Sequence, residues 1–116
     1  MSPKYFVEIL KKIVQEQAVK DILENLDEPP GLKPSNELLE LSFFYKSLDE
    51  EQKSILVKVL NETAEMTFFG LLCVLDGVRA IESGEDKGTL ELWYRKGNET
   101  ILLNDPDDEF LHDLMM

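Results

Sequence analysis

Residues 66–81, "MTFFGLLCVLDGVRAI", decide the fold that we predict for this chain. The ten residues from Met66 to Leu75 carry no charge, and Asp-Gly-Val-Arg follows them at once. Before them, apolar residues repeat at intervals of three and four, at Ile55, Leu56, Val59, Leu60 and Ala64. A helix that is apolar on one side and then nearly all round is entering a hydrophobic core. The sequence therefore predicts a central helix from about residue 49 to about residue 75, with an extension to residue 82 left open.

The start of the central helix has a signal of its own. Asp49 is a good N-cap, and Gln52 stands three residues later, which is the spacing of a capping box. Glu50 and Glu51 put negative charge in the first turn, where the helix dipole is positive. Further along, Gly70 lowers helix propensity by about 1 kcal/mol relative to alanine. We therefore expect another element to approach the helix closely at Gly70.

Asp76 and Arg79, at the exit of this helix, allow three interpretations. If the helix continues, the two side chains are spaced i, i+3 and can form an ion pair. If Gly77 ends the helix, they could instead clamp the turn to a nearby hairpin through charged hydrogen bonds. In the third interpretation Arg79 contacts an anion or ligand. We expect a buried structural pair that leaves no donor of Arg79 free to solvent.

On the N-terminal side, Ser2-Pro3 favours a helix start. The apolar stripe that follows thins near Gln15–Gln17, so we expect a kink or break near Glu16 within a bent helical region over residues 1–26. Three prolines and a glycine make residues 27–35 a loop. Residues 36–82 are then predicted to be helical, with Ser35 or Asn36 as the cap of the first helix.

On the C-terminal side the apolar period changes from helical spacing to two. "GTLELWYR" and "TILLN", separated by the turn residues "KGNE", predict an antiparallel hairpin over residues 88–103. "NDPDDEFLHDLMM" then predicts a helix over residues 106–115 that is capped by Asp105.

These segments together define the predicted fold. We expect one α+β domain over residues 1–116 that is predominantly α, a helical bundle around a long central helix. A small two-stranded antiparallel β-hairpin and a short C-terminal helix complete it.

Charge and hydropathy exclude several classes of function. The chain has 24 Asp and Glu against 12 Lys and Arg, a formal net charge of −12. This charge repels nucleic acid and anionic membrane surfaces. A membrane span needs about 20 apolar residues, whereas the uncharged run from Met66 to Leu75 has ten. The N-terminus lacks the pattern of a signal peptide. We expect a soluble, cytoplasmic protein that binds neither nucleic acid nor membrane. The charge indicates either solubility alone or an acidic face for a basic partner.

Few residues of the chain suggest catalysis, a metal or a cofactor. Cys73, the only cysteine, lies in the most apolar run, where an inert buried thiol is expected. There is no glycine-rich phosphate loop, and His112 is the only histidine. The acidic residues around it lack the spacing of an EF-hand, and the predicted helix cap accounts for them without a metal. The cluster comprises Asn104, Asp105, Asp107, Asp108, Glu109, His112 and Asp113. We therefore expect no metal and no cofactor.

Residues 28–114 resemble a set of small bacterial proteins of unassigned function. Five segments carry the resemblance: Phe69-Gly70, Cys73–Arg79, Gly88–Leu92, Leu103–Pro106 and Glu109–Leu114. The "PPGLKPSNELLELSFFYKSL" stretch fits the same pattern. The resemblance implies no reaction, cofactor or partner.

Three hypotheses of function follow. The first is a non-enzymatic binding or regulatory protein, for example an inhibitor or immunity-type partner of a basic protein. The second is a small enzyme or ligand-binding protein. Its pocket would lie near Asp76, Arg79, Asn104, Asp105 and His112. The third is a homodimer that pairs through part of the apolar helix or through the aromatic residues of Phe43–Tyr45.

Overall fold

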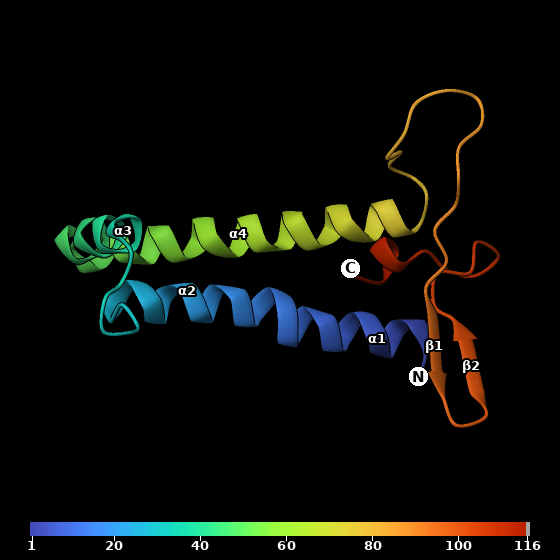
Figure 1. Cartoon of the computed structure of the whole chain (residues 1–116), viewed down its shortest axis with the longest axis horizontal. Helices are drawn as coiled ribbons and strands as arrows, with labels where there is room; N and C mark the ends of the chain where they lie inside the picture. Colours follow the sequence, from blue (N-terminus) through green and yellow to red (C-terminus); the bar gives the residue numbers. More distant parts are fainter. Residues whose placement is uncertain (116) are drawn as a thin grey trace. The chain divides into compact units, whose positions relative to one another are not determined.

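A computed structural model describes residues 1–115, and the chain is mostly helical (Figure 1). Its elements are α1 (Pro3–Leu10), the π-helical segment η1 (Lys11–Glu16), α2 (Gln17–Asp27), α3 (Asn36–Ser47), α4 (Glu50–Leu75), β1 (Trp93–Lys96), β2 (Glu99–Leu102) and the 3-10 helix η2 (Leu111–Met115). They divide into two compact units. Unit 1 contains residues 1–12 and the chain from residue 66 on, and unit 2 contains residues 13–65. The single domain remains a prediction.

The N-terminal helical region changes its winding where the sequence predicts a break. The Ser2 hydroxyl accepts a hydrogen bond from the Tyr5 amide at 3.1 Å and so caps α1. After Leu10, η1 widens the helix for six residues before α2 resumes the α-helical winding at Gln17. The predicted irregularity near Glu16 is therefore confirmed, and its form is a π-helical segment.

Unit 2 is organised by the packing of α2 against α3. Ser35 caps α3, because its hydroxyl accepts a hydrogen bond from the Leu38 amide at 3.1 Å. The buried Ser42 hydroxyl donates to the carbonyl oxygen of Leu26 at 2.6 Å. Leu26 lies in the last turn of α2, where helix carbonyls lack intrahelical partners. Ser42 of α3 thus supplies the hydrogen-bond donor for a carbonyl group at the C-terminal end of α2.

The long helix α4 begins as predicted and ends earlier than its longest predicted form. The Gln52 amide donates to Asp49 Oδ1 at 2.8 Å, and the Asp49 amide donates to Gln52 Oε1 at 3.0 Å, which is a complete capping box. After Leu75 the chain reverses at Gly77, whose φ is +77°. The Gly77 amide bonds the Val74 carbonyl and the Val78 amide bonds the Cys73 carbonyl, which is the Schellman pattern. The helical extension to residue 82 is therefore wrong.

The core of unit 1 lies where α1, the C-terminal part of α4 and η2 meet. Its buried members are Val7, Phe68, Leu72 and Leu111, and Phe6, Leu10, Leu75, Leu114 and Met115 pack around them. Figure 1 shows η2, in red, beside the end of α4. Cys73 is a buried free thiol, as expected from its apolar surroundings. No helix within residues 1–115 is long and apolar enough to cross a membrane.

The predicted hairpin is present but shorter than residues 88–103. β1 pairs antiparallel with β2, from Trp93 opposite Leu102 to Lys96 opposite Glu99. Gly97 takes φ +59° in the connecting turn. Residues 88–92 run in irregular backbone before β1, where the side chain of Asn104 bonds the main chain of Leu90 and Leu92. The N-terminal ammonium group lies against Glu99 Oε1 of β2 at 2.8 Å.

The predicted C-terminal helix over residues 106–115 is also shorter. Residues 105–108 form turns, in which Asp105 Oδ1 accepts from the Asp107 amide at 2.9 Å. Helical structure begins only at Leu111 and has the tighter 3-10 form. Asp105 caps a turn and not a helix, so its predicted role is wrong. The first amides of η2 are satisfied by Asp76, a residue distant in sequence.

Candidate functional site

Asp76 joins the end of α4 to the start of η2. Its Oδ1 accepts from the Leu111 amide at 3.0 Å, and its Oδ2 accepts from the His112 amide at 2.9 Å. The same Oδ2 lies 2.7 Å from His112 Nδ1. A carboxylate at the C-terminal end of a helix faces the negative end of the dipole. Here two amides at the start of η2 and an imidazole compensate it, and its side chain is only 2% exposed.

His112 is held on both sides of its ring and at both nitrogens. Phe110 stacks on the imidazole with centroids 5.4 Å apart, and Phe69 meets it edge-on at 5.5 Å. Nδ1 contacts Asp76, and Nε2 lies 3.4 Å from Asp113 Oδ1. Nδ1 is engaged by a buried carboxylate, and the ring is 15% exposed between two aromatic side chains. The geometry therefore suits a structural histidine better than a general base.

Asn104 connects three separate pieces of backbone in unit 1. Its Oδ1 accepts from the Leu92 amide at 2.8 Å. Its Nδ2 donates to the carbonyls of Leu75 at 2.7 Å and Leu90 at 2.8 Å. The side chain is buried, and both of its polar atoms are occupied. Asn104 thus fastens the last residue of α4 to the segment that precedes β1.

Arg79 does not pair with Asp76. Within residues 1–115, its guanidinium forms neither an ion pair nor a hydrogen bond. It lies instead against Gly70 of α4, where a Cβ built on that glycine would stand 2.6 Å from Nη1. The close approach predicted at Gly70 is confirmed, and the approaching group is this guanidinium. The predicted ion pair is wrong, and so is the expectation that Arg79 has no free donor.

The acidic C-terminal residues do not converge on a common point. Asp105 and Asp108 accept hydrogen bonds from amides of their own turn, at 2.9 Å and 2.8 Å. Asp76 and His112 are engaged with each other. In the part of the chain that the structure describes, no group of three or more His, Cys, Asp or Glu side chains is arranged to hold a metal ion.

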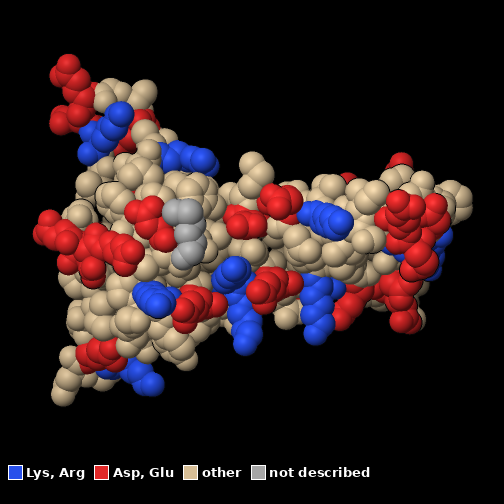
Figure 2. Space-filling model, turned by 180° about the vertical axis from the view of Figure 1, so that it is seen from behind, with Lys and Arg blue, Asp and Glu red and all other residues tan. Residues whose placement is uncertain are grey.

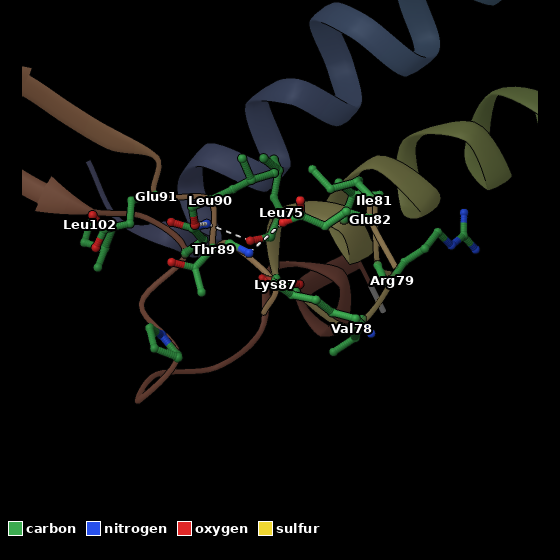
Figure 3. Close-up of a pocket in the computed structure, with 17 residues that line it drawn as sticks. Leu75, Val78, Arg79, Ile81, Glu82, Lys87, Thr89, Leu90, Glu91 and Leu102 are labelled. Carbon is green, nitrogen blue, oxygen red and sulfur yellow. Dashed lines mark hydrogen bonds between the residues drawn. The ribbon is translucent and has the colours of Figure 1, made fainter. Parts of the chain in front are cut away.

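A cavity of about 480 Å³ opens in unit 1 beside these residues (Figure 3). Its walls come from the turn after α4, the irregular segment before β1 and the exit of β2. The lining residues are Val74 to Glu82, Lys87 to Glu91, Leu102, Asn104 and Pro106. Asn104, in the wall of the cavity, donates to the carbonyls of Leu75 and Leu90. Figure 3 shows the guanidinium of Arg79 pointing away from the other labelled side chains.

The structure therefore brings part of the predicted site together. Asp76, Arg79 and Asn104 contribute to the cavity wall, and Asp76 contacts His112 behind it. Asp105 and His112 do not line the cavity. Glu82 and Lys87, which do, were not among the predicted site residues. No sequence signal marks them, because they lie in an irregular segment that only tertiary contacts shape.

Comparisons with protein-family models, curated proteins and solved structures find no match to this chain. The resemblance to small bacterial proteins therefore remains an expectation, and the function is argued from the molecule itself.

Proposed function

We propose that this chain is a non-enzymatic binding or regulatory protein of the cytoplasm, whose partner is a basic protein. The observation that carries the proposal is the outer surface of α3. Leu39 and Phe43 are one helical turn apart and share a face, and Phe43 is 79% exposed. Leu41 and Phe44, three residues apart, are exposed on a second face of α3. Exposed aromatic residues of this kind anchor protein interfaces.

The charges around α3 support a basic partner. Glu37 and Glu40 of α3 are exposed, and Asp49, Glu50 and Glu51 follow directly at the start of α4. An apolar centre with a charged rim is the usual composition of a protein interface. Lys46 is the only cation of α3. The rim is therefore acidic and would attract a basic surface.

The rest of the chain also carries an excess of exposed acidic side chains. Of the 24 Asp and Glu residues, all except Asp76 and Asp105 are exposed. Figure 2 shows many of them standing out from one face, with Lys and Arg between them. A net charge of −12 on exposed side chains accelerates the encounter with a positively charged protein. The field is screened by salt, so the association is expected to weaken as ionic strength rises.

The occupied polar groups of unit 1 also favour binding over catalysis. Asp76 and Asn104 use their hydrogen-bonding groups to hold the chain together, and His112 Nδ1 contacts Asp76. The alternative is a small enzyme or ligand-binding protein that uses the cavity beside Asp76 and Asn104. The cavity volume favours that alternative, but the cavity has no buried, unpaired polar group to orient a ligand.

The test is affinity capture from a lysate of the native host with the full chain as bait, at low and at high salt. The matched baits are the double variant Leu39→Ser, Phe43→Ser and the control Leu32→Ser. Leu32 is fully exposed in the loop before α3, outside the α3 face. We expect the wild type and the control to enrich the same basic protein at low salt, and high salt or the double variant to remove it. Enrichment that ignores the double variant, or no enriched basic protein at low salt, contradicts the proposal.

Sedimentation of the purified chain tests the homodimer through the same surface. A concentration-dependent dimer that the double variant abolishes would identify a second copy as the occupant of the α3 face. A monomer at every concentration leaves that face to a different protein.

A further inference from the structure

The Arg79 guanidinium of unit 1 lies against Gly70 of α4, and within residues 1–115 it has no acidic partner. Two features fix the backbone of Arg79. The turn at Gly77 reverses the chain, and the Arg79 amide then bonds the Cys73 carbonyl at 3.2 Å. The side chain is thereby directed back along α4, where Nη1 occupies the space that a Cβ on Gly70 would need. Gly70 is itself buried, although it lies in the middle of a helix.

The close approach of Arg79 to α4 depends on glycine at position 70. Glycine in a helix interior is unfavourable because of its backbone entropy. At position 70, alanine would force the guanidinium away, since the resulting contact of 2.6 Å is shorter than side chains tolerate. Glycine at position 70 thus leaves space on the helix for the guanidinium of Arg79, which has no hydrogen-bond or ion-pair partner within residues 1–115.

The part of α4 against which the guanidinium lies carries no charge. Met66 and Val74 lie one turn before and one turn after Gly70 on the same side of α4. Met66 is 70% exposed, and the whole run from Met66 to Leu75 is uncharged. Two acidic residues lie three positions from Arg79: Asp76 is committed to Leu111 and His112, and Glu82 Oε1 accepts from the Gly88 amide at 2.6 Å. The N–H groups that face away from Gly70 are therefore free to bind an acceptor from outside the chain.

We propose that Arg79, seated on Gly70, is a docking site for a carboxylate that carries an apolar group. The planar guanidinium offers parallel N–H donors that match the two oxygens of a carboxylate. Met66 and Val74 provide the surface for the attached apolar group. This site is in unit 1 and is independent of the α3 face, so either proposal can fail without the other.

The chain offers an internal control, because Arg79 and Arg95 are its only arginines. Each has one Nε–H group, and the two NMR signals can be assigned with the variant Arg95→Lys. The probes are benzoate, acetate, inorganic phosphate and the neutral benzamide, each titrated into the full chain at constant ionic strength. We expect a saturable shift of the Arg79 signal with benzoate, a weaker one with acetate and none with benzamide. The Arg95 signal should drift without saturating.

Gly70→Ala is the decisive variant. It keeps both arginines and the net charge, and alanine favours the helix, so the fold is retained. We expect the benzoate dissociation constant of Arg79 to rise about tenfold, because the guanidinium loses its seat and its bidentate geometry. Arg79→Lys, followed through the Gly70 amide, should weaken binding similarly, since an ammonium group cannot form the planar pair.

Three results would overturn the proposal. One is a response of Arg95 equal to that of Arg79, and another is undiminished benzoate binding by Gly70→Ala. The third is saturable binding of phosphate that is tighter than that of benzoate, which would identify the seat as a phosphate site.

Discussion

The end of α4 and the outer face of α3 differ in the polarity and burial of their side chains. At the end of α4, Asp76 and Asn104 are buried, and both are fully bonded to backbone groups distant in sequence. On α3, Leu39 and Phe43 are apolar side chains that face solvent. Buried polar groups stabilise a fold only when they are paired, whereas exposed apolar groups contribute little to it. The difference teaches that the polar side chains at the end of α4 serve the fold, whereas the apolar side chains on the outer face of α3 remain available for contact.

Among the substitutions at the end of α4, removal of the Asp76 carboxylate is expected to destabilise the chain most. Asp76→Ala leaves the amides of Leu111 and His112 without acceptors, and it releases the His112 ring. We expect the free energy of unfolding to fall by about 3 kcal/mol, since each buried unpaired group costs about 1–3 kcal/mol. Urea unfolding measures the loss.

Asp113→Ala is the matched control for that change. Asp113 also approaches the imidazole, at 3.4 Å from Nε2, but its side chain is 46% exposed. An exposed partner of this kind contributes about 0–1 kcal/mol. Equal losses in the two variants would mean that Asp76 does not fasten η2.

Asn104 is expected to matter next. Asn104→Ala leaves the carbonyls of Leu75 and Leu90 and the Leu92 amide unpaired. Water can reach the irregular segment before β1 more easily than the core, so we expect a loss of about 2 kcal/mol. Hydrogen exchange should accelerate at the Leu92 amide in particular. The exposed Asn61 of α4 provides the control, and a loss as large in Asn61→Ala would remove the special role of Asn104.

These bonds also show what can be predicted from sequence and what cannot. The capping box at Asp49 and Gln52, the cap at Ser35 and the chain reversal at Gly77 depend on residues within a few positions. Local sequence predicts the capping box, leaves Ser35 and Asn36 open as the cap of α3, and leaves helical and non-helical exits open at Gly77. The irregular winding near Glu16 was predicted on the same local grounds.

The candidate site was less predictable because its bonds are distant in sequence. Asp76 and His112 are 36 positions apart, and nothing in either neighbourhood identifies the other as its partner. Asp105 has a better local sequence for a helix cap than Asp76, because Pro106 follows it. In the structure Asp105 instead accepts from the Asp107 amide within a turn, and helical structure begins only where the Leu111 amide donates to Asp76. Spacing assigns Arg79 to Asp76, whereas in the structure its guanidinium lies against Gly70 of α4.

Ser42 provides a smaller test of the paired groups, in unit 2. Ser42→Ala removes the hydroxyl that bonds the Leu26 carbonyl at 2.6 Å and leaves that carbonyl buried between α2 and α3. We expect a loss of about 1 kcal/mol in the free energy of unfolding. Ser54→Ala, at an exposed position of α4, should change stability by less than about 0.5 kcal/mol. A negligible effect of both substitutions would show that water or a neighbour replaces the hydroxyl of Ser42.

Phe43 should give the smallest change in stability and so completes the comparison. Phe43→Ser removes an aromatic ring that is 79% exposed, so little buried area is lost on folding. We expect the free energy of unfolding to change by less than about 0.5 kcal/mol, whereas the capture of a basic partner should be lost. Urea unfolding and affinity capture of the same variant separate the two effects. A large destabilisation would mean that Phe43 packs within the fold, and the α3 face would then no longer be a free surface.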